Sequence, residues 1–409
     1  MRWVNKALQK ELLMHVLGNP NSDFYDRKYA GLQVDGAHFF DLPMLTRAEL
    51  GAAPLAQRTF CPQQDVRFAA FTSGTSSKEP LIIPFSKVAN YHFEPSLGTG
   101  VVRPLVIHPP MMKAFGMTFV QQCEESDHKL SPIFGDVQNM ANSGLLAEAL
   151  WCDSIYSIPT VAGLFAHEAV RRGIGGQIKL VALSSEILTT ARRAELTAAF
   201  PNALIANLYG STELGQLPFF TCKSMMERED NHFHILTDAL AAVEIIDGEL
   251  VVSYGLNLAT PLVRYRTGDF FEEVPDGCAC GLSGPVIHWS HRTDVDRVRL
   301  NGMEFDVEAS DRAFAVFPHL SGLPYQVHFY ATEGSSAIRI TVEIAAPQAQ
   351  AEDLTRFIEA ELPEIWRISA TATIRTAIER GFISSFKAHA VPALSITGLK
   401  TKRFVNHVT

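Results

Sequence analysis

The sequence predicts an α/β fold in which a large N-terminal domain with wound mixed sheets is followed by a small α+β domain. Short apolar runs alternate with helical patterns through most of the chain, which is typical of wound sheets. After Arg292 the pattern changes to alternating strands on either side of one helical segment. With 409 residues, 47% of them hydrophobic, the chain has material for two or three domain-sized units. We therefore expect a large domain over residues 1–292 and a small one over residues 293–409.

One β-α-β unit is predicted near the middle of the chain. Residues 178–183 form an apolar run typical of a buried strand, and residues 203–208 form a second one. Between them, residues 189–200 have the spacing and the Thr cap of a helix. Tyr209 then follows at the carboxyl end of a strand, where open α/β sheets bind ligands. The side chains that this helix is expected to turn toward solvent include Arg192 and Arg193.

The two ends of the chain have their own patterns. Residues 1–13 interleave charged and apolar side chains, which predicts an amphipathic helix rather than a signal peptide. In the small domain, residues 338–344 alternate as a strand, residues 352–362 have helical spacing, and residues 369–375 alternate again. These segments predict a compact α+β unit.

Composition excludes several classes of function. The net charge of −9 gives no electrostatic footprint for nucleic acid or for an anionic membrane surface. We find no stretch of roughly 18 apolar residues, the length that spans a bilayer. Six cysteines in so long a chain are too few for a disulfide scaffold, so we expect a protein of the reducing cytoplasm. The sequence predicts no particular oligomeric state.

A loop rich in hydroxyl groups has the sequence Thr72-Ser73-Gly74-Thr75-Ser76-Ser77. Its hydroxyls are hydrogen-bond donors, and its glycine lets backbone N–H groups approach a pyrophosphate. The Gly-Lys-(Ser/Thr) ending of a Walker A loop is absent. The alternative interpretation is a solvated Ser/Thr turn.

A second candidate loop has the sequence Leu208-Tyr209-Gly210-Ser211-Thr212-Glu213. The Tyr209 ring can stack on adenine, Thr212 can hydrogen-bond the α-phosphate, and Glu213 is a hard oxygen ligand suited to Mg²⁺. The alternative is a turn at the end of a strand with a surface glutamate.

The third segment is Tyr265-Arg266-Thr267-Gly268-Asp269. An ionised Asp269 is a pure acceptor that can take two O–H bonds from a ribose. Arg292, further along, would add a fork of donors to the ribose or the α-phosphate. The alternatives are an aspartate that caps a turn and a surface arginine.

The fixed order of these three segments resembles the adenylate-forming enzymes, and the resemblance covers nearly the whole chain. Within that superfamily the chain is most similar to the phenylacetate-CoA ligase-like branch. Residues 40–50, Phe-Asp-Leu-Pro-Met-Leu-Thr-Arg-Ala-Glu-Leu, resemble the branch's Leu-Pro-x-x-(Thr/Ser)-Lys segment. Cys278-Ala279-Cys280-Gly281 resembles its Cys-x-Cys-Gly turn.

The resemblance implies the reaction and further site residues. ATP with Mg²⁺ would convert a carboxylic acid, aryl or extended and apolar, to an acyl-adenylate and pyrophosphate. CoA, an amine or a carrier-protein thiol would then displace AMP. Ser185 and Glu186 lie where relatives carry Gly-Gly-Glu, which lines the adenine pocket. An acyl pocket is implied between residues 108 and 131, and a small C-terminal domain would rotate about a join near Asp294.

The C-terminal tail, residues 397–404, resembles the family's Gly-Lys-x-x-Arg-type ending. The implied lysine bridges the substrate carboxylate and the α-phosphate during adenylation, where a mobile cation stabilises the transition state. Lys400 matches this lysine if Leu399 is an insertion. Lys402 is the alternative lysine, and a solvated basic terminus is the alternative interpretation of the tail.

A structural zinc site is a further prediction. Cys222 and His234 lie near the place where relatives have a Cys followed by Gly-Leu-His, and Cys278 and Cys280 follow downstream. Together these four can form a tetrahedral site, with His232 as an alternative fourth ligand. Free cysteines that simply fill the core are the competing interpretation.

Two other functions remain open on the sequence. One is an amide-forming ligase of secondary metabolism, because the chain is short and its motifs are irregular. The other is a nucleotide-binding protein of this fold that has lost turnover. Ser77, at a position where relatives have glycine, and the shifted Lys400 motivate the second alternative.

Overall fold

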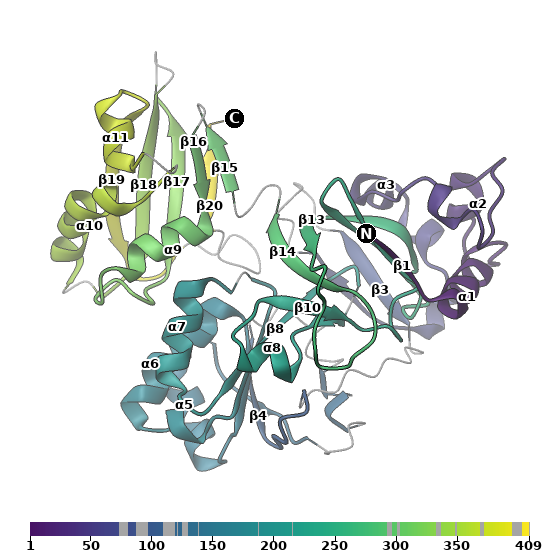
Figure 1. The fold of residues 1–409 in the computed structure, drawn as a ribbon, viewed down its shortest axis with the longest axis horizontal. Coiled ribbons are helices and arrows are strands. Elements are labelled where there is room, and N and C mark those ends of the chain that lie inside the picture. The colour runs from purple at the N-terminus through teal and green to yellow at the C-terminus, as the bar shows by residue number, and fades with distance from the viewer. Residues whose placement is uncertain are drawn as a thin grey trace.

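In the part of the chain that it describes, the computed structural model has two main sheets, each with its own helices, and two further two-stranded sheets (Figure 1). We call residues 1–292 the large unit and residues 297–408 the small unit. The structure describes residues 1–72, 81–86, 97–108, 119–120, 122–124, 130–137, 139–186, 188–214, 216–292, 297–300, 303–332, 337–347, 350–368, 372–394 and 403–408.

The large unit is built on a sheet whose described strands number twelve. Strands β4 to β8 of this sheet run parallel, and the strands from β9 to β1 pair antiparallel. Across the sheet the strands are β1 (Arg2–Val4), β11 (Ala242–Ile246), β12 (Glu249–Tyr254), β13 (Leu262–Glu273), β14 (Val286–Arg292), β10 (His232–Ile235), β9 (Gln216–Phe220), β8 (Leu204–Ser211), β7 (Leu180–Ser184), β6 (Ser154–Ser157), β4 (Pro104–Ile107) and β5 (Ile133–Phe134). A separate antiparallel pair is formed by β2 (Val66–Phe71) and β3 (Ile82–Ser86).

Helices pack on the parallel half of the sheet, and α3 packs against β13 in the antiparallel half. Helix α6 packs against β6, β7, α5 and α7, and α7 packs against β8. Strands β4, β6 and β7 are buried on both faces, as parallel strands under helices are. The helices of the large unit are α1 (Lys6–Val16), α2 (Phe24–Lys28), α3 (Arg47–Ala52), α5 (Met140–Ala149), α6 (Pro159–Arg172), α7 (Thr190–Ala199) and α8 (Lys223–Glu227), with short 3₁₀ helices at η1 (Phe39–Asp41), η2 (Leu55–Arg58), η3 (Gln63–Asp65) and η4 (Gly175–Gln177).

The small unit has its own apolar core. Its four described sheet strands are ordered β19-β18-β17-β20, and α10 and α11 pack against β19. Trp366 is fully buried in this core, among the aromatic rings of Phe305, Phe314 and Phe386. The elements are β15 (Arg297–Leu300), β16 (Met303–Asp306), α9 (Val307–Ala315), β17 (Tyr325–Ala331), β18 (Ile338–Ala345), α10 (Ala351–Ile365), α11 (Ile374–Glu379), β19 (Ile383–Val391) and β20 (Phe404–His407).

The predicted α/β class with a second, smaller sheet is confirmed. The β-α-β unit is β7-α7-β8, and the Thr189 side chain caps α7 by accepting from the Arg192 N–H. Strand β8 continues to Ser211, so Tyr209 lies inside the strand near its end. No helix in the described ranges is long and apolar enough to cross a membrane.

The predicted exposure of Arg192 and Arg193 is wrong, because both side chains are buried, at 6% and 5% exposed. Arg192 forms an ion pair with Glu195 on the next turn of α7. Arg193 donates to the Ile205 carbonyl and to the Asn231 side chain. Burial is tolerated because each guanidinium has polar partners.

Two predicted elements are also wrong in part. Residues 2–4 form β1, which pairs with β11, and the helix begins only at Lys6 after the Asn5 cap. The strand predicted over residues 369–375 is instead the start of a helix where it is described. Thr373 and Thr376 form a capping box, and α11 begins at Ile374. Alternation over so few residues does not distinguish a strand from the first turn of a helix.

Candidate active site

Glu213 is the centre of a buried polar cluster at the end of β8. Its carboxylate is 6% exposed. Arg47 Nη1 donates to Glu213 Oε1 at 2.6 Å, and the Tyr265 hydroxyl donates to the same oxygen at 3.1 Å. Arg47 Nη2 donates to the Thr72 hydroxyl, which also accepts from the Leu81 N–H at 2.9 Å. The cluster therefore joins the 208–213 segment, the 265–269 segment and the first residue of the hydroxyl-rich loop.

Arg47 is held in this position by its backbone. It is the first residue of α3, which begins with a capping box between Thr46 and Glu49. Just before the cap, Leu45 forms a parallel bridge with Tyr265 and exchanges backbone hydrogen bonds with β13. Arg264, whose φ of +48° is left-handed, donates to the Leu42 carbonyl and makes a buried ion pair with Glu244. The segment before α3 is thus fixed along β13.

Tyr209 and Asp269 bond to one another across the strands. The Tyr209 hydroxyl donates to Asp269 Oδ2 at 2.6 Å. The Tyr209 ring makes edge contacts with Phe219 and Phe271, with ring centroids at 5.3 and 4.9 Å, so neighbouring rings hold its orientation. Asp269 faces Arg292 in the register of β13 and β14. These three positions, predicted from separate segments, lie on adjacent parts of one sheet.

Residues 184–186, at the end of β7, include one unusual backbone conformation. Ser185 has a φ of +71°, in the left-handed region that favours glycine. The turn to the next helix therefore keeps a conformation suited to glycine although serine stands there. Glu186 points back to α6, and its Oε2 accepts from the Thr160 N–H at 2.9 Å. A carboxylate at this place complements the N-terminus of α6.

Several predicted site residues lie outside the described residues or are described only in part. Thr212 is half-buried next to Glu213, and Gly210 lies in β8. Arg292 is described by its backbone only, as the last residue of β14. Phe119, in the implied acyl region, is buried with its ring 4.5 Å from that of Tyr156. The residues outside the described ranges are Ser73, Gly74, Thr75, Ser76, Ser77, Asp294, Leu399, Lys400 and Lys402.

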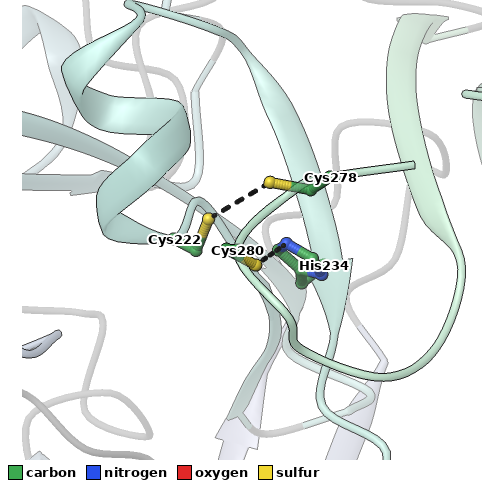
Figure 2. A group of neighbouring side chains, drawn as sticks. All are labelled: Cys222, His234, Cys278 and Cys280. Atoms are coloured by element: carbon green, nitrogen blue, oxygen red, sulfur yellow. Dashed lines mark hydrogen bonds between the residues drawn. The ribbon is translucent and has the colours of Figure 1, made fainter. Parts of the chain in front are cut away.

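The structure brings Cys222, His234, Cys278 and Cys280 together (Figure 2). Cys222 caps α8, His234 lies in β10, and the other two lie in the turn between β13 and β14. Their four candidate ligand atoms lie within 4.8 Å of one another. The Sγ atoms of Cys222 and Cys278 are 3.7 Å apart, and Cys280 Sγ is 3.2 Å from His234 Nε2. His232, the alternative ligand, instead packs its ring against His288.

The pKa values of the clustered side chains are shifted in different directions. Burial raises the pKa of the Cys222 thiol to about 12. Burial would also raise the pKa of Cys278, but hydrogen bonds from the Cys280 backbone and from Arg228 lower it overall. Burial lowers the pKa of His234, which favours the neutral imidazole that binds metals.

Sequence reasoning missed two members of the Glu213 cluster. Arg47 lies in the 40–50 segment, which was used only for its resemblance to a family motif, and Tyr265 begins the segment that ends at Asp269. The available signal for Arg47 was its place one residue after Thr46, which with Glu49 has the Ser/Thr-x-x-Glu pattern of a capping box. Its distance of 166 residues from Glu213 left the contact itself unpredictable.

No described protein family and no curated protein matches this sequence. Among solved structures, the chain is similar to 2-hydroxyisobutyryl-CoA ligase in the postadenylation state in complex with R3-HIB-AMP. The TM-score is 0.75 at 15% identity, over 98% of this chain and 89% of that one. For the same ligase in the thioesterification state, with 2-HIB-AMP and CoA, the TM-score is 0.58 at 14% identity and the same coverage.

A second enzyme shares the architecture over most of its length. It is the O-succinylbenzoate coenzyme A synthetase of Bacillus subtilis, solved with ATP and magnesium ion. The TM-score is 0.53 at 13% identity, over 82% of this chain and 68% of that one. The large mixed sheet, the separate small sheet and these similarities together show that the chain has the fold of the adenylate-forming CoA ligases.

Proposed function

We propose that this protein is an acid-activating, AMP-forming ligase. In the first half-reaction, a carboxylate oxygen of the acid bonds to the α-phosphorus of ATP and pyrophosphate leaves. In the second, a thiol or amine bonds to the acyl carbon and AMP leaves. The single observation that carries the proposal is the buried carboxylate of Glu213. It lies where the hydroxyl-rich loop, the 208–213 segment and β13 meet.

Magnesium suits the chemistry of this cluster. Glu213 is a hard oxygen ligand, and its carboxylate is already paired with a cation, the Arg47 guanidinium at 2.6 Å. We propose that Glu213 holds Mg²⁺ when the nucleotide binds. The ion would neutralise phosphate charge, and the B. subtilis synthetase of the same fold was solved with ATP and magnesium ion. Thr212, on the same loop, is proposed to hydrogen-bond the α-phosphate.

The Tyr209–Asp269 pair is proposed to hold the nucleoside. Asp269 is 6% exposed and accepts a short hydrogen bond from the Tyr209 hydroxyl. A ribose offers O–H donors of the same kind, so a bound ribose can share or replace this bond. The ring of Tyr209 stays oriented by Phe219 and Phe271 and offers a face to adenine. Ser185, Glu186 and Arg292 are proposed to line the same site.

The division into domains 1–292 and 293–409 stays a proposal, which the two separate sheets support. The small unit's strand β20 begins at Phe404, the last residue of the tail that carries Lys400 and Lys402. Strand β20 pairs in parallel with β17, which anchors the end of the tail to the small sheet. We propose that Lys400 stabilises the transition state of adenylation, with Lys402 as the alternative.

The four-residue cluster is proposed to hold a structural zinc ion. Zn–S bonds of about 2.3 Å in a tetrahedron put two sulfurs about 3.8 Å apart. The Cys222–Cys278 separation of 3.7 Å fits this value. Zinc would tie the start of α8 to the β13–β14 turn. The same Cys-x-Cys-Gly turn and residues 40–50 support placing the chain in the phenylacetate-CoA ligase-like branch.

Carboxylate-dependent exchange between ATP and labelled pyrophosphate tests the function. We expect exchange with one or more acids of a panel that holds aryl, extended aliphatic and short branched acids. Glu213→Gln should reduce the exchange strongly, and Glu364→Gln, on the surface of α10, should leave it unchanged. ATP binding without exchange for any acid would favour a binder that has lost turnover. CoA, amine and carrier-protein acceptors, supplied with the active acid, would separate a CoA ligase from an amide-forming ligase of secondary metabolism.

A further inference from the structure

A buried hydrogen bond joins the large unit to the small unit. Thr189 Oγ1 donates to Asp311 Oδ2 at 2.7 Å, and the two residues are 1% and 8% exposed. The same Oγ1 accepts from the Arg192 N–H at 3.3 Å, which caps α7. The Thr189 hydroxyl therefore donates to Asp311 in α9 of the small unit and accepts from the first turn of its own helix, α7. A threonine with both functions satisfied is rigidly oriented.

The other oxygen of Asp311 is bound within the small unit. The Tyr325 hydroxyl donates to Oδ1, and Arg403 Nη1 forms an ion pair with it at 3.3 Å. The Arg403 guanidinium carbon also lies 4.4 Å from the centroid of the Tyr325 ring. Although burial opposes the charge of Arg403, Asp311 raises its pKa overall, and Glu186 and Glu195 of the large unit contribute. Asp311 is thus shared between Thr189 on one side and Arg403 on the other.

Two further contacts lie beside this bond. The Thr190 N–H donates to Glu308 Oε2 at 3.4 Å. At Gly322, beyond α9, an added Cβ would lie 2.3 Å from Glu195 Oε1 and 2.7 Å from His167 Nε2, so backbone meets α6 and α7 closely here. Figure 1 shows α9 of the small unit next to α7 of the large unit, in agreement with their contacts.

The bonded residues adjoin two segments of the proposed active site. Thr189 lies three residues after the 184–186 segment, and Arg403 directly follows Lys402 in the tail. The fold matches the 2-hydroxyisobutyryl-CoA ligase better in its postadenylation state than in its thioesterification state, with TM-scores of 0.75 and 0.58 at equal coverage. The two units of this chain are thus arranged more as in the former.

We propose that Thr189, Asp311 and Arg403 form a latch that holds the small unit in the arrangement for adenylation and must open before acyl transfer. The inference rests on the proposed function and adds positioning residues to it. The tail before Arg403 is carried into place only while Asp311 is bonded to Thr189. A hydrogen bond to a charged group shifts such an equilibrium by about ten- to a hundredfold.

Two variants loosen the latch by independent means. Thr189→Val removes the donor to Asp311, and Thr189→Ser keeps it together with the helix cap. Gly322→Ala inserts a methyl group against Glu195 and His167. Gly381→Ala is its matched control, because Gly381 has a φ of +75° like the +80° of Gly322 but nothing within 4 Å of an added Cβ. Both alanines introduce similar backbone strain, but only the one at position 322 places a methyl group in the interface between the two units.

The readouts are small-angle scattering of the free protein and the two half-reactions measured separately. We expect Thr189→Val and Gly322→Ala to increase the radius of gyration and to slow adenylate formation about tenfold or more. Consumption of supplied acyl-adenylate should keep its rate or rise, and Thr189→Ser and Gly381→Ala should match the wild type. Wild-type scattering and rates in both loosened variants would overturn the latch, as would equal loss of both half-reactions.

The scattering readout separates the latch from the proposed function. If the wild type shows no adenylation with any acid, the proposed function fails, and the assignment of the latch to that step falls with it. An expanded Gly322→Ala beside a compact Gly381→Ala would still establish that the contact of the small unit with α6 and α7 holds the two units together.

Discussion

Arg47 Nη1 donates to Glu213 Oε1 at 2.6 Å, across 166 residues of sequence, while its Nη2 reaches the Thr72 hydroxyl. The guanidinium thus lies beside one oxygen of the carboxylate that we propose as the magnesium ligand. Two cations cannot share this oxygen closely without repulsion, because like charges a few ångströms apart in a buried site interact strongly. Magnesium bound at Oε1 would therefore displace Arg47, whose second hydrogen bond runs to Thr72, the first residue of the hydroxyl-rich loop.

Replacing Arg47 should make the protein depend on magnesium for stability. Arg47→Met leaves a buried carboxylate without its cation, at a cost of about 1–3 kcal/mol. We expect a melting temperature a few degrees lower, and a larger recovery on adding Mg²⁺ with a non-hydrolysable ATP analogue than in the wild type. Arg27→Met is the control, because its ion pair with Asp23 is exposed on both sides. An equal magnesium effect on wild type and Arg47→Met would contradict the shared position.

Asp269 should contribute mainly to nucleotide affinity. Asp269→Asn replaces a charged acceptor with a neutral one that also donates, and hydrogen bonds to charged groups contribute about 1.5–3 kcal/mol. Calorimetry should show an ATP dissociation constant raised by about ten- to a hundredfold. Tyr209→Phe, which removes only the hydroxyl bonded to Asp269, should weaken binding less. Unchanged ATP affinity in Asp269→Asn would remove Asp269 from the ribose site.

Zinc should be found at about one ion per chain by elemental analysis. Cys222→Ala should lose the ion and lower the melting temperature, because the proposed zinc ion would tie α8 to the β13–β14 turn. Cys61→Ala is the control, since Cys61 is a free cysteine outside the cluster. Thiols must lose protons to bind zinc, and the pKa of Cys222 is about 12 in the zinc-free protein, so zinc affinity should fall as pH falls. Zinc-free protein of full thermal stability would assign these cysteines to the core.

The local part of the fold could be predicted because it is encoded locally. Strands β7 and β8 are short apolar runs, and α7 between them has a Thr cap and a helical repeat. The antiparallel half could not be predicted in the same way. The pairing of β1 with β11 joins segments some 240 residues apart, and only the folded core fixes such a register.

The candidate site likewise has a locally encoded part and a part that depends on long-range contacts. Tyr209, Glu213 and Asp269 could be selected because each stands in a short motif whose residue types suit one part of a nucleotide. Their bonds to other side chains, such as Arg47 to Glu213, depend on which distant segments the sheet brings together. Arg193 shows that the exposure of a charged side chain is also hard to predict from sequence. Its helical position predicted a solvent-exposed side chain, but the side chain is buried and donates to the Asn231 side chain and the Ile205 carbonyl.

The tail offers the last prediction, because one lysine there should serve the first half-reaction and little of the second. Adenylation brings two anions together, whereas acyl transfer from a ready-made adenylate needs a path for the nucleophile and the release of AMP. We expect Lys400→Ala to slow adenylation by about a hundredfold or more and to spare consumption of supplied acyl-adenylate. Single-turnover measurements of each half-reaction check this. Lys402→Ala is the matched control: if it abolishes adenylation while Lys400→Ala behaves like the wild type, Leu399 is no insertion and Lys402 is the catalytic lysine. Equal loss of both half-reactions in Lys400→Ala would reject a lysine that leaves the site between the two steps.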